Sequence, residues 1–147
     1  MIAQRSRRRI TAHFVVEEFD SRDGARVPDA QLPAIEKLCD WWLEALRADF
    51  GAVHVLSGYR SAAHNLAVGG ARRSVHLLTT PLPGRTASSS VMAAAADVHC
   101  ERGTPREWAA WARRERQVST LLGGRSRGGI GTYRGFIHLD TGPARDW

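Results

Sequence analysis

Cysteine is scarce in this sequence, and long apolar runs are absent from it. Cys39 and Cys100 are the only cysteines in 147 residues, which is too few for a disulfide framework, and neither stands in a CxxC or Cys-His cluster. We therefore expect two buried free thiols. No stretch approaches the ~20 apolar residues of a membrane span, and none of signal-peptide length follows the arginines at 7–9. We expect no membrane span and a product that is cytoplasmic as synthesised.

Acidic residues are also in the minority, with 15 Asp+Glu against 21 Lys+Arg and a formal net charge of +6. A basic surface suits an anionic partner such as nucleic acid, a membrane face or an acidic cell-wall polymer, but it also occurs without any dedicated partner. Hydrophobic residues make up 43% of the chain and charged residues 24%, which indicates a globular protein rather than a disordered one. The length fits one domain with a single core.

Two helices are predicted from apolar spacing and capping signals. Residues 29–50 carry apolar side chains at steps of three and four, which is typical of an amphipathic helix, and Gly51 follows as its stop. Residues 104–107, Thr-Pro-Arg-Glu, form a capping box with proline at the first helical position. The apolar face of this second helix is expected to contain Trp108 and Trp111.

Short strands are predicted between and after these helices. Residues 53–56 indicate a strand that leads into a turn at residues 57–61, and residues 128–133 and 136–140 indicate two strands joined by a turn. The expected fold is therefore α+β: a small single domain over residues 1–147, with a short antiparallel sheet packed against helices.

Two segments stand outside this pattern. Residues 1–12 form a short basic N-terminal arm, and residues from about 79 to 93 form a turn-rich stretch. Pro81 and Pro83 in that stretch disfavour both a helix and a central strand. We expect a surface loop there.

Three separated residues are candidate metal ligands: His76, Asp97 and His138. Two imidazoles and one carboxylate are a ligand set that Zn²⁺ accepts while a fourth position stays open for water, as in catalytic zinc sites. Taken singly, each has an ordinary alternative, because a histidine on a strand is more often a hydrogen-bonded polar residue and an aspartate often caps a turn. If the three converge, the sequence predicts a hydrolase.

Five motifs occur in one order around these residues. They are His13-Phe14 with Glu17-Glu18-Phe19; Ser57-Gly58-Tyr59-Arg60-Ser61 with His64-Asn65 and Gly69-Gly70; Ser74-Val75-His76; Ala95-Ala96-Asp97; and Gly128 to Tyr133 with Phe136 to Gly142, Arg145 and Trp147. In this order the chain resembles the M15 peptidases, the zinc D-Ala-D-Ala carboxypeptidase and endopeptidase family of peptidoglycan enzymes, especially its small bacterial and phage members. The resemblance implies a Hedgehog/DD-peptidase-like fold around a zinc cleft.

The resemblance also implies roles for individual residues. His76, Asp97 and His138 match the zinc ligands of the family and would hold one Zn²⁺ ion. Arg60 matches the arginine that faces a substrate carboxylate or carbonyl oxygen near the metal, in a catalytic and substrate-binding role. Ser74 matches a position that contacts substrate in relatives.

One departure from the family is plain in the spacing. The first histidine and the aspartate are usually seven residues apart, whereas here they are twenty-one apart, and Thr79 replaces the motif glycine. An insertion of about fourteen residues can loop out without moving either ligand, because the cost of loop closure grows only logarithmically with length. It can equally disturb the site.

The general base is not evident from the sequence. Relatives use an acid or a histidine a few residues before the last ligand, but positions 133–136 here are Tyr, Arg, Gly and Phe. Asp140 lies two residues beyond His138, on the same face of a strand, and is the first candidate. Its alternative role is to hydrogen-bond a ligand histidine or the turn that follows. His99 stands in the same relation to Asp97 and is the second candidate.

Three functions follow from these observations. The first is a zinc peptidase that hydrolyses peptide bonds of peptidoglycan stem peptides at D-Ala, delivered as a phage-type lysin or virion-associated enzyme. The second is a catalytically impaired wall-binding or structural module of the same fold. The third is a nucleic-acid binder, which ranks last because the tryptophans at positions 41, 42, 108 and 111 fall at helical core positions and do not alternate with basic residues.

Overall fold

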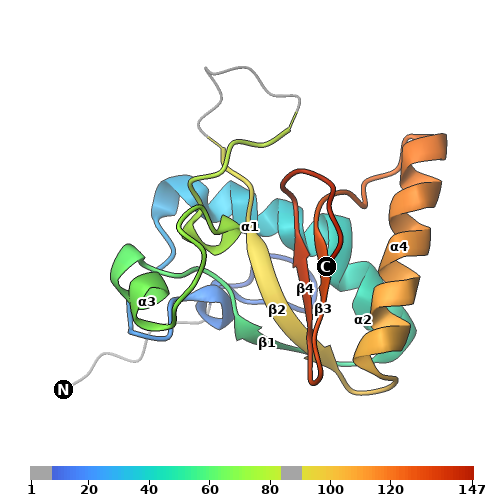
Figure 1. The fold of residues 1–147 in the computed structure, drawn as a ribbon, viewed down its shortest axis with the longest axis horizontal. Helices are drawn as coiled ribbons and strands as arrows, with labels where there is room; N and C mark the ends of the chain where they lie inside the picture. The colour runs from blue at the N-terminus through green and yellow to red at the C-terminus, as the bar shows by residue number, and fades with distance from the viewer. Residues whose placement is uncertain (1–7, 84–90) are drawn as a thin grey trace.

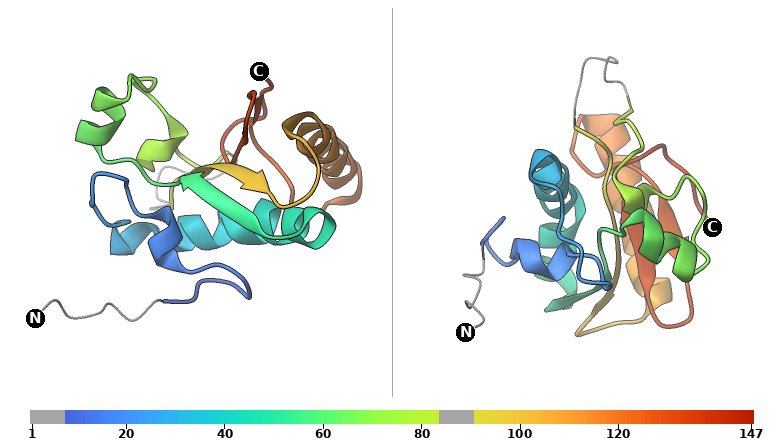
Figure 2. Two further views of the ribbon diagram at one scale, coloured as in Figure 1. Left: turned by 90° about the horizontal axis from the view of Figure 1, so that it is seen from below. Right: turned by 90° about the vertical axis from the view of Figure 1, so that its left-hand side faces the viewer.

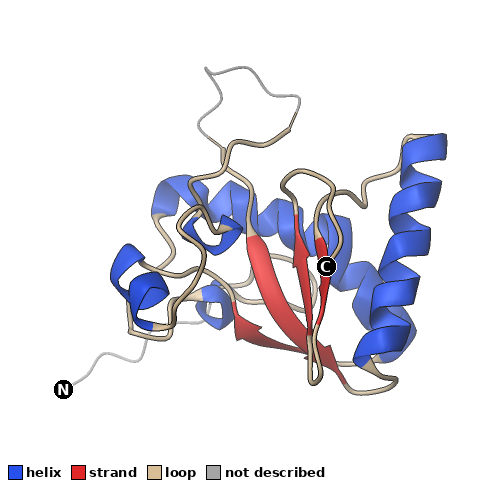
Figure 3. Ribbon diagram, in the orientation of Figure 1, coloured by secondary structure: helices blue, strands red, loops and turns tan. Residues whose placement is uncertain are grey.

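A four-stranded antiparallel sheet lies at the centre of the protein (Figure 1). The computed structural model describes residues 8–83 and 91–147. The strand order is β1-β2-β4-β3, and the strands are β1 (Val53–Ser57), β2 (Ala95–Cys100), β3 (Ile130–Thr132) and β4 (Ile137–Asp140). Helices and strands alternate along the chain (Figure 3), which confirms the α+β prediction.

One face of the sheet is covered by a long helical run (Figure 2). The run consists of η2 (Asp29–Gln31), α1 (Leu32–Leu38), the π-helical turn η3 (Cys39–Leu43) and α2 (Glu44–Phe50). The sequence predicted a single helix over residues 29–50, and the extent is confirmed. The π turn was not predicted. It accommodates an extra residue per turn and therefore shifts the register of the apolar face. Trp42, within it, is fully buried.

The opposite side of the sheet carries shorter elements. These are α3 (Ala62–Ala67) and the 3₁₀ turn η4 (Val75–Leu77), while another 3₁₀ turn, η1 (Val16–Phe19), packs near β1. Ser61 caps α3, because its hydroxyl accepts a hydrogen bond from the backbone N–H of His64. This short helix of six residues is not predicted from the sequence.

The long helix α4 (Pro105–Leu122) packs beside β3. Thr104 caps it by accepting a hydrogen bond from the backbone N–H of Glu107 at 3.3 Å. This start is the one that the Thr-Pro-Arg-Glu signal predicted. Trp108 and Trp111 are buried against α2 and its surroundings, as expected for a core face, and Trp111 meets Phe50 edge to face at 6.3 Å between ring centroids.

The core lies between the helical run and the sheet. Cys39 and Cys100 are buried there as free thiols, as predicted, and burial raises the pKa of both, to about 12 for Cys100. A smaller cluster of Val75, Leu82, Ala93 and Ala95 lies beneath the turn-rich segment. No helix among the described residues is long and apolar enough to cross a membrane.

The two ends of the turn-rich segment lie side by side. Pro81 and Met92 form an antiparallel bridge, and the N–H of Ala93 donates to the carbonyl of Thr80 at 2.7 Å. The middle of the expected loop, residues 84–90, lies outside the described residues, as do residues 1–7 of the expected N-terminal arm.

Candidate metal centre

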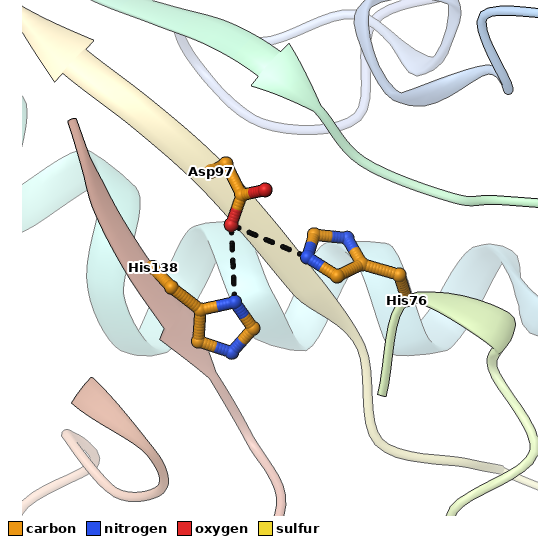
Figure 4. A group of neighbouring side chains, drawn as sticks. All are labelled: His76, Asp97 and His138. Atoms are coloured by element: carbon orange, nitrogen blue, oxygen red, sulfur yellow. Dashed lines mark hydrogen bonds and ion pairs between the residues drawn. The ribbon is translucent and has the colours of Figure 1, made fainter. Parts of the chain in front are cut away.

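His76, Asp97 and His138 come together at one point, on the face of the sheet opposite the helical run (Figure 4). Asp97 on β2 stands opposite His138 on β4 in the strand register, and η4 brings His76 to them from outside the sheet. Asp97 Oδ1 lies 3.2 Å from His76 Nε2 and 3.0 Å from His138 Nδ1. All three side chains are buried, with 3–8% of each residue exposed. The long separation in sequence therefore leaves Asp97 in place.

The ring nitrogen of each histidine that faces Asp97 is identified by the partner of the other ring nitrogen. His76 Nδ1 lies 2.7 Å from the carbonyl oxygen of Gly58, so this nitrogen must be the one that carries the proton. His138 Nε2 lies 2.7 Å from a carboxylate oxygen of Asp140, which likewise accepts. In the neutral rings, His76 Nε2 and His138 Nδ1 then present lone pairs to Asp97.

Three electron-pair donors thus converge, which is stable only if a proton or a cation lies among them. In a tetrahedral zinc site with metal–ligand distances of about 2.0–2.1 Å, the ligand atoms are about 3.3 Å apart. The two contacts of Asp97, at 3.2 and 3.0 Å, are close to that spacing. All three candidate ligand atoms lie within 4.8 Å of one another, so the group could hold a metal ion.

The pKa values of Asp97 and His138 are shifted by their contacts with each other and with their neighbours. Burial opposes ionisation of Asp97, but its contacts with His138 and His76, which are hydrogen bonds when the facing nitrogen carries a proton, outweigh burial and hold the pKa of its carboxyl well below the usual range. Burial alone would lower the pKa of His138, but its contacts with Asp140 and Asp97 raise it above the ordinary value. Without a metal, these contacts favour the protonated form of His138.

Asp140 is enclosed on all sides. Its Oδ2 accepts a hydrogen bond from His138 Nε2. Its Oδ1 accepts hydrogen bonds from the backbone N–H groups of Gly129 and Gly142 at 2.8 and 2.9 Å. The residue has no exposed surface. A base must reach the proton that it abstracts, so this geometry favours the alternative role of orienting His138. That Asp140 is the general base stays a prediction.

A glycine pair and a tryptophan hold Asp140 in position. A Cβ atom on Gly128 would lie 1.9 Å from the carbonyl oxygen of Asp140, and one on Gly129 would lie 2.6 Å from its carboxylate. Only glycine allows this close approach. From η3, Trp42 Nε1 donates to the same carbonyl of Asp140 at 2.9 Å and to that of Arg127 at 2.7 Å. The helix on the far side of the sheet therefore supports the site.

Arg60 lies beside Asp97 and is mostly buried. Its Nη2 is 3.3 Å from Asp97 Oδ2, Nη1 donates to Asn65 Oδ1 and Nε donates to Ser57 Oγ, both at 3.3 Å. These contacts use three of the five guanidinium N–H groups and leave two for another acceptor. The backbone of Arg60 is fixed as well, because its N–H donates to the carbonyl of His76 at 2.9 Å.

The three candidate ligands open into a cleft of about 860 Å³. Arg60 and Ser74, both predicted to meet substrate, line it, and the Ser74 hydroxyl accepts a hydrogen bond from the backbone N–H of His76 at 3.3 Å. For several other lining residues the sequence predicted no role, although some of them belong to the motifs. They are Arg73, Tyr133, Phe136, Arg145 and Trp147. The closing R.W pattern was the available signal for the last two.

The charge of the cleft is positive. Three arginines line it, at positions 60, 73 and 145, against Asp97 and Asp146. Asp146 is already paired, because its carboxylate contacts Arg113 and Arg116. The cleft therefore suits an anionic ligand.

His99, the second candidate base, does not line this cleft in the described part of the chain. Its ring instead packs on that of His54 across β1 and β2, with 4.9 Å between ring centroids. The structure thus brings the three metal candidates together with Arg60 and Ser74, and it leaves His99 with a different neighbour.

Comparison with known proteins gives one match. A family model described as Peptidase M15 matches residues 12–140. A search of curated proteins and a search of solved structures found no match.

Proposed function

Because the chain belongs to the M15 peptidase family, a metallopeptidase family, we propose that it is a zinc-dependent peptidase that hydrolyses peptidoglycan peptide bonds at D-Ala. The observation that carries this proposal is the convergence of His76 Nε2, Asp97 Oδ1 and His138 Nδ1 on one point of a cleft. Each histidine has its other nitrogen held by an acceptor, so that the inward atom is free to bind a cation.

The residues of the chain have distinct tasks in this proposal. His76, Asp97 and His138 would hold a zinc ion, which would supply a Lewis acid and a bound water of lowered pKa. The two unengaged N–H groups of Arg60 hold a carbonyl or carboxylate oxygen of the substrate next to the ligand Asp97. Ser74 borders the same space and contacts the peptide backbone. Asp140 keeps the ring of His138 in one orientation and one tautomer.

The charge of the cleft supports this substrate class. Peptidoglycan stem peptides carry free carboxylates, and the cleft presents Arg60, Arg73 and Arg145 with no unpaired acid among its described lining residues outside the metal set. The net charge of +6 further suits approach to an anionic cell-wall polymer.

Purified protein with one equivalent of zinc tests the proposal. We expect it to release shortened stem peptides from cell-wall muropeptides, detected by mass spectrometry, and we expect Asp97→Asn to abolish both cleavage and tight zinc binding. Asp40→Asn, a matched change at a partly exposed acid paired with Arg125, is expected to leave both intact. If the zinc-loaded protein leaves muropeptides unchanged, the proposal is wrong. Sedimentation of that inactive protein with isolated cell walls would instead support the wall-binding alternative.

A further inference from the structure

The cleft lacks an ordinary acid or base among its described residues. Peptide hydrolysis needs a proton donor for the leaving amine, normally a carboxyl or an imidazole. The titratable acids and histidines that line the cleft are the three metal candidates and Asp146. Asp146 is engaged by two arginines, and Asp140 has no exposed surface. Another side chain must donate the proton.

Tyr133 is the side chain that lines the cleft with a phenol group. It lies at the turn between β3 and β4, where its backbone N–H donates to the carbonyl of Phe136 at 3.0 Å. Its ring stacks on that of Phe136, with 4.5 Å between centroids and 9° between planes. The stack fixes the plane of the ring, and 42% of the residue is exposed.

Trp147 ties this phenol to the metal centre. Its Nε1 donates to Tyr133 Oη at 2.7 Å, and its ring lies 4.9 Å from that of His138. Residues 145–147 run beside β3, where Ile130 and Thr132 each donate a backbone hydrogen bond to them. A Cβ atom on Gly131 would lie 2.6–2.8 Å from the indole, so glycine is needed for Trp147 to sit there.

The direction of that hydrogen bond decides what the phenol can do. Indole N–H is a donor only, so Tyr133 Oη is the acceptor from Trp147. A phenol that accepts from Trp147 keeps its own O–H for a second partner. No hydrogen bond from this O–H to another described residue is present, and Tyr133 borders the cleft.

We propose that Tyr133 is the proton donor of the reaction, held in place by Trp147 through the Nε1–Oη hydrogen bond. This inference rests on the proposed peptidase function. As the scissile C–N bond breaks, its electron pair goes to nitrogen, the phenol O–H bond breaks and a new N–H bond forms. Over one turnover, water supplies a hydroxyl group to the carbonyl carbon, and its remaining proton returns the phenolate to a phenol.

The chain offers a matched pair of variants, because it contains only two tyrosines, Tyr59 and Tyr133. Tyr133→Phe removes one oxygen and keeps the stacked ring. General acid catalysis contributes about 10²–10⁴-fold, so we expect kcat to fall by roughly 100-fold or more, with KM and zinc content changed little. Tyr59→Phe removes the same oxygen from a residue packed against the core, outside the cleft lining, and is expected to retain activity.

Fluorine labelling supplies a readout besides activity. In the Tyr59→Phe protein, biosynthetic incorporation of a fluorinated tyrosine labels position 133 alone. We expect the ¹⁹F resonance to shift when a phosphinate peptide, which mimics the tetrahedral carbon, binds the zinc-loaded protein.

The outcomes separate the two proposals. An active wild type whose Tyr133→Phe variant keeps its kcat would overturn the role of Tyr133 and leave the peptidase proposal standing. A fluorine resonance that does not respond to the phosphinate would place the phenol away from the reacting bond and would also overturn it. A zinc-loaded wild type that cleaves no muropeptide overturns both.

Discussion

At the level of single residues, the candidate metal centre depends on groups that never face the cleft. The carbonyl of Gly58 and the carboxylate of Asp140 each accept a hydrogen bond from one imidazole nitrogen, so that this nitrogen cannot bind a metal. Such partners fix the ring orientation and raise the basicity of the ligating nitrogen. The sequence pattern indicates which histidines are candidate ligands, whereas the tautomers follow only from these contacts.

Replacing Asp140 by asparagine tests its role as the partner of His138. The change keeps the size of the side chain but removes the charge that orients the imidazole. Loss of such an outer partner typically costs about 10–100-fold in metal affinity, so we expect the zinc Kd of Asp140→Asn to rise by about that factor in a chelator competition assay. Asp40→Asn is the control. Unchanged zinc affinity together with lost peptidase activity would instead support Asp140 as the general base.

The pH dependence of unfolding follows from the same residues. In the metal-free protein, Asp97 and Asp140 have pKa values lowered from 3.8, so they stabilise the fold above that pH and lose this contribution as the pH falls through the lowered values. His138 has a pKa raised from 6.5, so its contribution is complete below 6.5 and is lost as the pH rises through the higher value. We therefore expect the Tm in chelator to decline above pH 6.5.

Zinc is expected to reverse the alkaline side of this profile. Zinc binding requires deprotonated ligands, so the gain in Tm on adding zinc should grow as the pH rises from 5 to 8. Thermal unfolding followed by circular dichroism, with and without zinc, measures both trends. His99→Gln, at a histidine outside the cleft, serves as the control and is expected to show the same profiles. A zinc effect that is constant with pH would contradict a site that contains His138.

At the level of elements, the sequence was informative where local signals were strong. The apolar spacing of residues 29–50 and the capping residues before Pro105 predicted the two longest helical segments. The strand β2 gave no such signal, because its first residues are alanines and its side chains are buried on both faces. Its place in the middle of the sheet comes from pairing with β1 and β4, which are distant in sequence.

The Gly128-Gly129 segment between α4 and β3 provides a test of how closely the elements pack. Gly128 has φ +113°, and an added Cβ atom would meet the backbone of Asp140 at 1.9 Å. The backbone of β4 cannot yield without moving His138. We expect Gly128→Ala to lower the free energy of unfolding by roughly 3 kcal/mol or more, at the upper end of single substitutions, and to weaken zinc binding.

Gly123→Ala is the matched control for this prediction. Gly123 also has a positive φ, +71°, but no atom lies within 4 Å of an added Cβ. Its cost is therefore limited to the left-handed backbone, about 1–2 kcal/mol. Chemical denaturation compares the two variants, and equal losses would argue against steric contact with Asp140.

At the level of the whole molecule, the site is built by long-range contacts that the sequence could indicate only through the order of its motifs. The three ligand candidates and Arg60 were identified from that order. The cleft residues Tyr133 and Trp147 received no role, because their position depends on how residues 145–147 pair with β3. The long spacing between His76 and Asp97 did not show whether the two residues meet. They do meet, because the two ends of the inserted segment pair with each other.

The inserted segment can therefore be shortened without loss of the metal site. Thr80 and Ala93 are joined by a backbone hydrogen bond, and Pro81 pairs with Met92, so the segment leaves and re-enters the domain at one place. Replacing residues 84–90 by Asn-Gly retains this pairing and the buried Leu82. Since loop closure entropy changes by only about 0.6 kcal/mol per doubling of length, we expect the free energy of unfolding to change by less than about 1 kcal/mol and the zinc Kd to stay within about twofold.

Isothermal titration and chemical denaturation measure the zinc Kd and the free energy of unfolding. Leu82→Ala, which opens a cavity in the cluster of Val75, Leu82, Ala93 and Ala95, is the variant expected to lose stability. A large loss of zinc affinity in the shortened protein would mean that residues 84–90 hold Asp97 in place, contrary to the positioning by β1 and β4 described above.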